Sequence, residues 1–202
     1  VVTGNRCFLT GKRWPSENMD ECYQGIRVHR APTLGTMRRS LAGKVISYLS
    51  FMVSALWTGL RIERPDVVIG TSPPLFQLLP TWLVAFLRRR PFVLEIRDLW
   101  PAFAVDMGVL RNRLVIRLAE YAERFFYRRA TRIIVHSPAY IDYLVDLGVP
   151  KQKLRFIPNG VDPQTMTSNG DGGSTRKALH LNGEFVVTYA GTLGLANDVE
   201  TM

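Results

Sequence analysis

Short apolar runs alternate with longer helix-like segments along this chain, and that alternation restricts the fold more than any other feature of the sequence. The apolar runs, rich in valine, isoleucine, leucine and phenylalanine, lie at residues 66–70, 92–96, 132–136 and 154–157. The helix-like segments lie at residues 38–63, 75–89, 110–130 and 137–147. Strands and helices that alternate at this spacing are typical of βαβ units, whose strands form a mostly parallel sheet. We therefore expect an α/β fold with a Rossmann-like parallel sheet flanked by helices.

The two ends of the chain differ from this regular middle part. Residues 5–35 are rich in turn formers and contain one short predicted strand, at 26–30. Residues 168–174 are polar and rich in glycine, which is typical of a flexible linker. A β-rich run at 186–190 then breaks into a glycine turn. These changes predict a first domain at 1–165, a linker at 166–182 and the start of a second domain at 183–202.

The net charge of +9 is concentrated in one part of the chain. Residues 88–132 contain eleven arginines but only five acidic residues. Such a basic surface favours anionic lipid, nucleic acid or phosphorylated substrates as partners. No helix-turn-helix, zinc-finger or RNP-type aromatic signature accompanies it, so we expect an anionic membrane surface and no nucleic acid.

Two helical segments are unusually apolar. Residues 41–60 carry a single charge, Lys44, over a length that could span a bilayer. Serines, a threonine and two glycines in the same segment also fit a helix buried in the core or one that lies against a membrane. Residues 75–87 place Trp82 and Phe86 beside a run of three arginines, which is what an interfacial docking surface needs.

In parallel α/β sheets, ligands bind beyond the carboxyl ends of the strands, which directs attention to four loops. Arg97 and Asp98 directly follow a buried strand and are the sharpest candidates for chemistry. The alternative is an Arg–Asp pair that only fixes the loop, with Trp100 filling the core. Thr71 and Ser72 could offer hydroxyls to an anionic group, or they could simply cap the next helix.

Two further loops carry candidates of the same kind. His136 and Ser137 end another strand, where the imidazole could act as a base or contact a substrate, or could be a hydrogen-bonded structural residue. Asn159 lies in the turn after the last strand. The chain contains no Asp-x-Asp pair, P-loop or dinucleotide fingerprint, and its two cysteines fit no zinc site. We therefore expect no metal and no cofactor.

Three motifs, in this order and spacing, resemble the retaining, nucleotide-sugar-dependent glycosyltransferases of family four. They are the run Glu95–Pro101 (E-x-R-D-L-W-P), the turn Pro158–Asp162 (P-N-G-V-D) and the run Tyr189–Gly194 (Y-x-G-x-L-G). The first of these is similar to bacterial surface-polysaccharide transferases of the fucosamine-transferase type.

The resemblance implies the N-terminal domain of a GT-B fold, truncated at both ends, with its first strand and helix upstream. It implies catalytic roles for Arg97 and Asp98, with Arg97 where many relatives have histidine. It also implies substrate contacts from the residues Thr71, Ser72, Trp100, His136, Ser137 and Asn159, and donor-phosphate contacts from Gly191, Thr192 and Gly194.

On this resemblance, the expected function is transfer of a sugar from a nucleotide-diphosphate donor to a lipid-linked glycan in bacterial surface-polysaccharide synthesis. The enzyme is expected in the cytoplasm, peripheral on the inner face of the plasma membrane, and the fragment alone is expected to be inactive. Two other classes remain open: a GT-B nucleotide-sugar epimerase, and a non-catalytic module that binds membrane or glycan.

Overall fold

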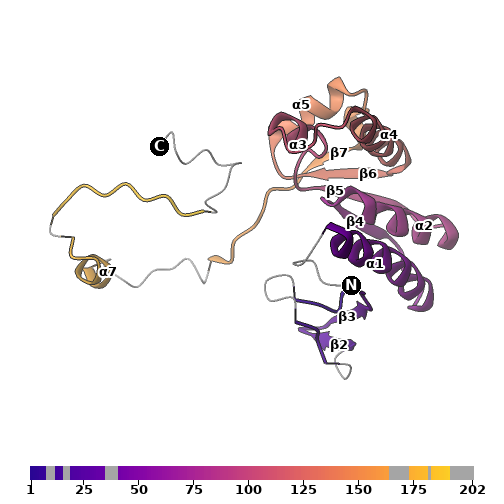
Figure 1. Cartoon of the computed structure of the whole chain (residues 1–202), viewed down its shortest axis with the longest axis horizontal. Coiled ribbons are helices and arrows are strands. Elements are labelled where there is room, and N and C mark those ends of the chain that lie inside the picture. The colour runs from indigo at the N-terminus through magenta and orange to yellow at the C-terminus, as the bar shows by residue number, and fades with distance from the viewer. Residues whose placement is uncertain (8–11, 16–18, 35–40, 164–172, 182, 192–202) are drawn as a thin grey trace. The chain divides into compact units, whose positions relative to one another are not determined.

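The computed structural model describes residues 1–7, 12–15, 19–34, 41–163, 173–181 and 183–191. The chain divides into two compact units, Val1–Ile157 and Pro158–Met202, and each is described by itself. The first unit contains a layer of helices, a four-stranded sheet and a smaller three-stranded sheet (Figure 1).

All four strands of the larger sheet are parallel, as the sequence predicts. They lie in the order β4 (Val68–Ser72), β5 (Phe92–Ile96), β6 (Arg132–Val135) and β7 (Leu154–Phe156). The first of them is shifted from its predicted span of 66–70, because it begins and ends two residues later. Thr71 pairs with Glu95 and Ser72 with Ile96, so both hydroxyl residues belong to the strand and not to the loop after it.

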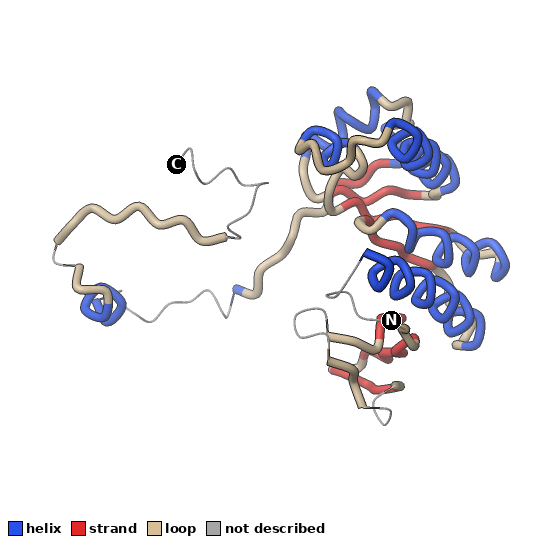
Figure 2. Tube along the Cα trace, in the orientation of Figure 1, coloured by secondary structure: helices blue, strands red, loops and turns tan. Residues whose placement is uncertain are grey.

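The helices follow the predicted alternation (Figure 2). They are α1 (Leu41–Arg61), η2 (Leu75–Gln77), α2 (Leu78–Arg88), α3 (Ala102–Asp106), α4 (Arg113–Arg129), α5 (Pro138–Asp146) and η3 (Lys151–Lys153). The start of α4 is fixed by Asn112, whose side-chain oxygen accepts hydrogen bonds from the backbone N–H groups of Leu114 and Val115, at 2.9 and 3.3 Å. This satisfies two of the donors that a helix N-terminus leaves unpaired.

The hydrophobic core lies on one face of the larger sheet. Alternate residues of β5 and β6 point into it, because successive side chains of a strand face opposite sides. These strand residues are Phe92, Leu94, Ile96, Ile133 and Val135, all buried. Side chains from α2, α4 and α5 complete the same cluster. Residues of the other face, such as Ile69, are absent from the cluster, and Ile69 is 58% exposed.

The three-stranded sheet corrects the expectation of an irregular segment with one strand at 26–30. Its strands are β1 (Val2–Gly4), β2 (Asp20–Tyr23) and β3 (Ile26–Ala31), in the order β1-β3-β2. Strands β2 and β3 form an antiparallel hairpin, and β1 pairs parallel to β3. Gln24 and Gly25 turn the hairpin with φ values of 48° and 80°. This is the positive-φ conformation that two-residue hairpin turns require, and a glycine supplies it readily.

Helix α1 packs on α2 and on the three-stranded sheet. Gly59 allows the close approach to α2, because a Cβ there would lie 2.8 Å from Cγ2 of Val84. The outer side of α1 is exposed and apolar, with Leu49, Val53 and Trp57 among its residues. Among the described residues, no helix combines the length and apolarity needed to cross a membrane.

The second unit contains one described helix, α7 (Gly173–Ala178), which lies within the residues predicted as linker. The predicted strand at 186–190 is wrong for the structure, since residues 184–190 have no regular secondary structure. A strand is completed by hydrogen bonds to a neighbour, and the described part of this unit contains no other strand to supply them. The predicted domain limits stay predictions.

Candidate functional site

The carboxyl ends of the parallel strands bring five of the predicted site residues to one edge of the sheet. Thr71 and Ser72 end β4, Arg97 and Asp98 follow β5, and His136 follows β6. The backbone N–H of Arg97 donates to the carbonyl of Ser72 at 2.9 Å, which ties the loop after β5 to the end of β4. This edge is where ligands bind in open α/β sheets.

The side chains of Arg97 and Asp98 are exposed and uncommitted. Neither forms an ion pair or a side-chain hydrogen bond with any residue that the structure describes, so the alternative of an Arg–Asp pair that fixes the loop is wrong. Backbone groups hold the loop in place: Trp100 N–H donates to the Asp98 carbonyl at 3.0 Å. The Tyr140 hydroxyl also donates a hydrogen bond to the Arg97 carbonyl, at 3.5 Å. Both charges can therefore meet a ligand.

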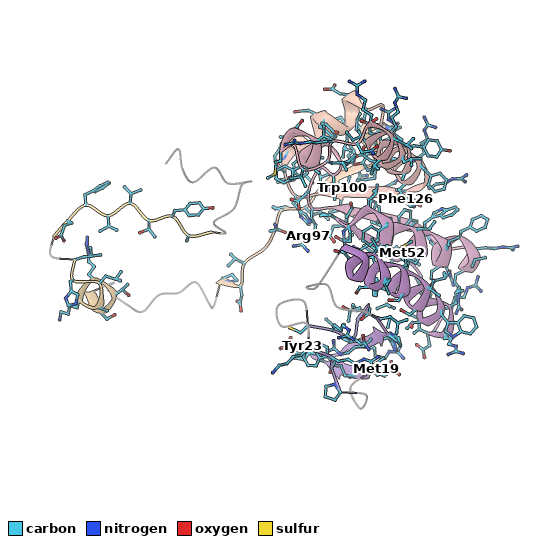
Figure 3. The ribbon with its side chains drawn as sticks, viewed as in Figure 1. Met19, Tyr23, Met52, Arg97, Trp100 and Phe126 are labelled. Atoms are coloured by element: carbon cyan, nitrogen blue, oxygen red, sulfur yellow. The ribbon has the colours of Figure 1, made fainter. Side chains whose placement is uncertain are left out.

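Trp100 lies near Arg97 in the sequence but has different surroundings (Figure 3). Its side chain is partly buried and packs against the hydrophobic core. This is the arrangement expected of a residue that fills the core under the loop. Its predicted substrate contact stays a prediction.

His136 connects three strands through its two ring nitrogens. Nδ1 lies 2.8 Å from the carbonyl oxygen of Ile157, at the end of β7, and Nε2 lies 3.0 Å from Oε1 of Glu95 in β5. Which ring nitrogen donates depends on the tautomer, since a neutral imidazole carries its one N–H on either nitrogen. This geometry agrees with a hydrogen-bonded structural histidine. A role as base would require Nε2 to leave Glu95.

Thr71 and Ser72 do not cap a helix, contrary to the alternative drawn from the sequence. The N-cap positions of η2 and α2 are Pro74 and Gln77, and neither makes a side-chain capping bond. Ser72 is buried, and the hydroxyl oxygen of Thr71 is buried with no hydrogen-bond partner among the described residues. A buried hydroxyl without a partner is costly, and this one lies beside a pocket.

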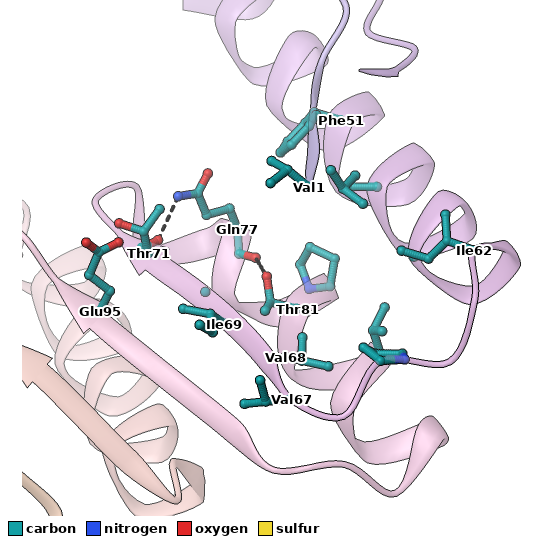
Figure 4. Close-up of a pocket in the computed structure, with 17 residues that line it drawn as sticks. Val1, Phe51, Ile62, Val67, Val68, Ile69, Thr71, Gln77, Thr81 and Glu95 are labelled. Atoms are coloured by element: carbon teal, nitrogen blue, oxygen red, sulfur yellow. Dashed lines mark hydrogen bonds between the residues drawn. The ribbon is translucent and has the colours of Figure 1, made fainter. Parts of the chain in front are cut away.

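That pocket has a volume of about 610 Å³ and lies among β1, α1, β4 and α2. Its walls are mostly apolar, with Phe51 and Ile69 among the lining residues. Thr71, Gln77 and Glu95 form its polar end (Figure 4). The Gln77 side-chain amide donates to the Thr71 carbonyl at 2.6 Å. Glu95 also contacts His136. The polar end of the pocket is therefore continuous with the residues at the carboxyl ends of the strands.

Three residues at this edge of the sheet were not predicted as site residues: Glu95, Gln77 and Tyr140. Glu95 had a usable signal, because it is the one charged residue of the apolar strand β5. Tyr140 lies one turn into α5, close to Asp98. Partial burial, followed by the negative charge of Asp98, raises the pKa of the Tyr140 phenol, which therefore keeps its proton as a donor.

Of the other predicted site residues, Ser137 follows His136 at this same edge, and the rest belong to the second unit. Ser137 is the N-cap of α5, without a side-chain capping bond. Asn159 and Gly191 are exposed residues of the second unit, and Thr192 and Gly194 lie outside the described residues. Within the described ranges, no group of three or more histidine, cysteine or acidic side chains could hold a metal ion.

Comparison with known proteins assigns this chain to a family. The family model described as "Glycosyl transferase 4-like domain" matches residues 6–160. Over 133 residues the chain is 30% identical to the UDP-N-acetylglucosamine–N-acetylmuramyl-(pentapeptide) pyrophosphoryl-undecaprenol N-acetylglucosamine transferase of Syntrophotalea carbinolica. That match covers 64% of this chain and 33% of the relative.

Two solved structures of Anabaena HepE, one with UDP-glucose and one with UDP and glucose, have the same fold. Each has a TM-score of 0.50 at 18% sequence identity, and covers 77% of this chain and 37% of HepE. The fold class predicted from the sequence, the Rossmann-like α/β domain of a GT-B protein, is confirmed. The chain spans about a third of the length of the relatives it matches.

Proposed function

Because this chain belongs to the glycosyl transferase 4-like domain family, we propose that it is the acceptor-side domain of a retaining glycosyltransferase of the fucosamine-transferase type. The enzyme moves a sugar from a nucleotide-diphosphate donor to a lipid-linked glycan of a bacterial surface polysaccharide. It works in the cytoplasm, on the inner face of the plasma membrane. The name of the Syntrophotalea relative, which pairs a UDP-sugar with a pyrophosphoryl-undecaprenol acceptor, supports this choice of substrates.

The observation that carries the proposal is the pair of exposed, uncommitted charges at the end of β5. The guanidinium of Arg97 suits a phosphate or diphosphate, to which its planar donors can bond in pairs. The carboxylate of Asp98 can accept a hydrogen bond from a sugar hydroxyl. Placed at the strand end by backbone bonds, the two groups need little reorganisation when a ligand arrives.

In the proposed reaction, the bond between the anomeric carbon and the donor phosphate breaks, and the acceptor hydroxyl oxygen bonds to that carbon. The electron pair leaves with the diphosphate, which also takes the hydroxyl proton. Arg97 bonds the diphosphate of the lipid-linked acceptor, and Asp98 orients the acceptor sugar. Donor-phosphate contacts from Gly191, Thr192 and Gly194 remain part of the proposal, as does a reaction without a metal.

Acceptor binding tests this proposal directly by isothermal titration calorimetry. The probe is a short-prenyl pyrophosphoryl N-acetylglucosamine, and Arg97→Ala and Asp98→Ala should each weaken its binding about tenfold or more, the usual effect of losing a charge-assisted hydrogen bond. Arg132→Ala is the matched control, since this exposed arginine begins β6 and so lies at the other end of a strand. The control should bind as the unchanged chain does.

Equal binding by all four proteins would remove Arg97 and Asp98 from the acceptor site. Incubation with UDP-glucose alone separates the enzyme classes. Release of an epimerised nucleotide sugar would contradict the transferase and favour an epimerase.

A further inference from the structure

Helix α4 has apolar residues on its outer side as well as on its buried inner side. Its inner side, with Ala119, Glu123 and Phe126, is buried. On the opposite side, Leu114, Leu118 and Tyr121 recur every three or four residues and are 67%, 60% and 72% exposed. Residues at this spacing share one helix face. A contiguous exposed apolar stripe on a folded protein marks an interaction surface.

Aromatic contacts extend this stripe onto α2. Phe125 follows Tyr121 on the same face of α4, and its ring meets the Trp82 ring edge-on at 5.0 Å. Trp82 stacks on Phe86 at 5.6 Å, and Phe86 is 61% exposed. The exposed residues Leu114, Leu118, Tyr121 and Phe86, with Phe125 and Trp82 between them, form one surface, called the α4–α2 outer surface below.

Arginines border this surface. Arg117, Arg124 and Arg128 are exposed on one side of the stripe, and none of the three forms an ion pair within the described part of the chain. Arg129 lies 5.3 Å from the centre of the Phe125 ring and 5.9 Å from that of Trp82. The stripe is thus apolar in its middle and cationic at its margin.

We propose that the α4–α2 outer surface docks on an anionic lipid bilayer, with the leucines and Phe86 entering the headgroup region and the arginines binding lipid phosphates. Charge complementarity selects this partner, because a basic amphipathic helix with aromatic residues lies stably in an anionic interface. The outer stripe of α1, with Leu49 and Val53, is also exposed, but among the described residues no comparable row of arginines borders it. The inference rests on the proposed function only for its biological setting, a lipid-linked acceptor.

Co-sedimentation with vesicles of phosphatidylglycerol and phosphatidylcholine, free of any glycolipid, tests the docking surface. The chain should bind vesicles containing phosphatidylglycerol, lose that binding as salt rises, and ignore pure phosphatidylcholine. The triple variant Arg117→Gln, Arg124→Gln and Arg128→Gln should bind about a hundredfold more weakly, at about fivefold for each arginine. Leu118→Ser should weaken binding about tenfold.

Matched controls separate this surface from a general effect of charge or apolarity. Leu49→Ser makes the same substitution at a comparably exposed site on α1, and the triple variant Arg61→Gln, Arg64→Gln and Arg132→Gln removes the same charge elsewhere. Both controls should bind as the unchanged chain does. The proposal is overturned if the controls lose as much binding as the test variants, or if the chain binds no vesicles. Because Arg97 and Asp98 are unchanged in these variants, this result is separable from the calorimetric test of the acceptor site.

Discussion

The two faces of the four-stranded sheet have opposite characters, and β5 belongs to both. Leu94 points into the core and is 1% exposed, whereas the next residue, Glu95, points to the other face, where it meets His136 and the pocket. Three helices cover the first face. Successive side chains of a strand alternate between the two faces of the sheet. One set therefore packs in the core and stabilises the fold, and the other set is available for polar contacts. Substitutions on the two faces should therefore differ in kind.

The largest difference is expected in β5 itself. Leu94→Ala leaves a cavity in the centre of the core and should lower the free energy of unfolding by about 2–5 kcal/mol. Val93→Ala, one residue away on the other face, removes partly buried methyl groups and should cost about 1 kcal/mol. Urea denaturation followed by circular dichroism measures both. Equal losses would contradict the assignment of the core to a single face.

The core face also contains a buried acid, which gives it a pH dependence. Glu123 on α4 accepts a hydrogen bond from the Tyr127 hydroxyl at 2.6 Å. Burial raises the pKa of Glu123 from 4.5 to about 7, although Tyr127 and Arg124 act to lower it. Burial, followed by the charge of Glu123, also raises the pKa of Tyr127, which remains a donor.

Since the folded chain holds the Glu123 proton more tightly than the unfolded chain, this residue's contribution to stability is full below pH 4.5 and is lost as the pH rises to about 7. Across that window the free energy of unfolding should fall by about 3 kcal/mol. Glu123→Gln has no proton to lose, so the difference between variant and unchanged chain should vary by that amount. Urea titrations at pH 4.5, 6 and 8 measure it. A difference that stays constant with pH would show that Glu123 titrates normally.

The smallest effect is expected on the open face. Glu95→Gln keeps an acceptor for His136 but removes the negative charge, and should change the free energy of unfolding by about 1 kcal/mol. The pair is partly exposed, so water compensates for much of the lost attraction. Urea denaturation at pH 6 is the measurement, with Val93→Ala as the comparison. A loss as large as that of Leu94→Ala would show that both faces support the fold equally.

Much of the fold could be predicted from the sequence, because period and composition determine it locally. The apolar runs of β5, β6 and β7 fall where they were expected. Strand β3 was predicted at 26–30, but its hairpin partner β2 was not, since β2 is mostly exposed and has no core-facing alternation. The run at 186–190 has the composition of a strand, but local composition does not show whether a neighbouring strand is there to pair with it.

The candidate site could be predicted only in part. The rule that ligands bind at strand ends found Thr71, Arg97 and His136. It could not find the bond between His136 and Glu95, which are 41 residues apart and meet only through the register of β5 and β6. Nor could it tell that Arg97 and Asp98 form no ion pair with each other, because that depends on the conformation of the loop.

The double anchoring of His136 has a mechanical consequence. Ile157 is the last residue of the first unit, and its carbonyl is held by the same imidazole that holds Glu95. One rigid ring therefore links the backbone at Ile157 to a carboxylate that lines the pocket. The point where the chain leaves the sheet and the polar end of the pocket are thus connected by a single side chain, so a shift at one would displace the other.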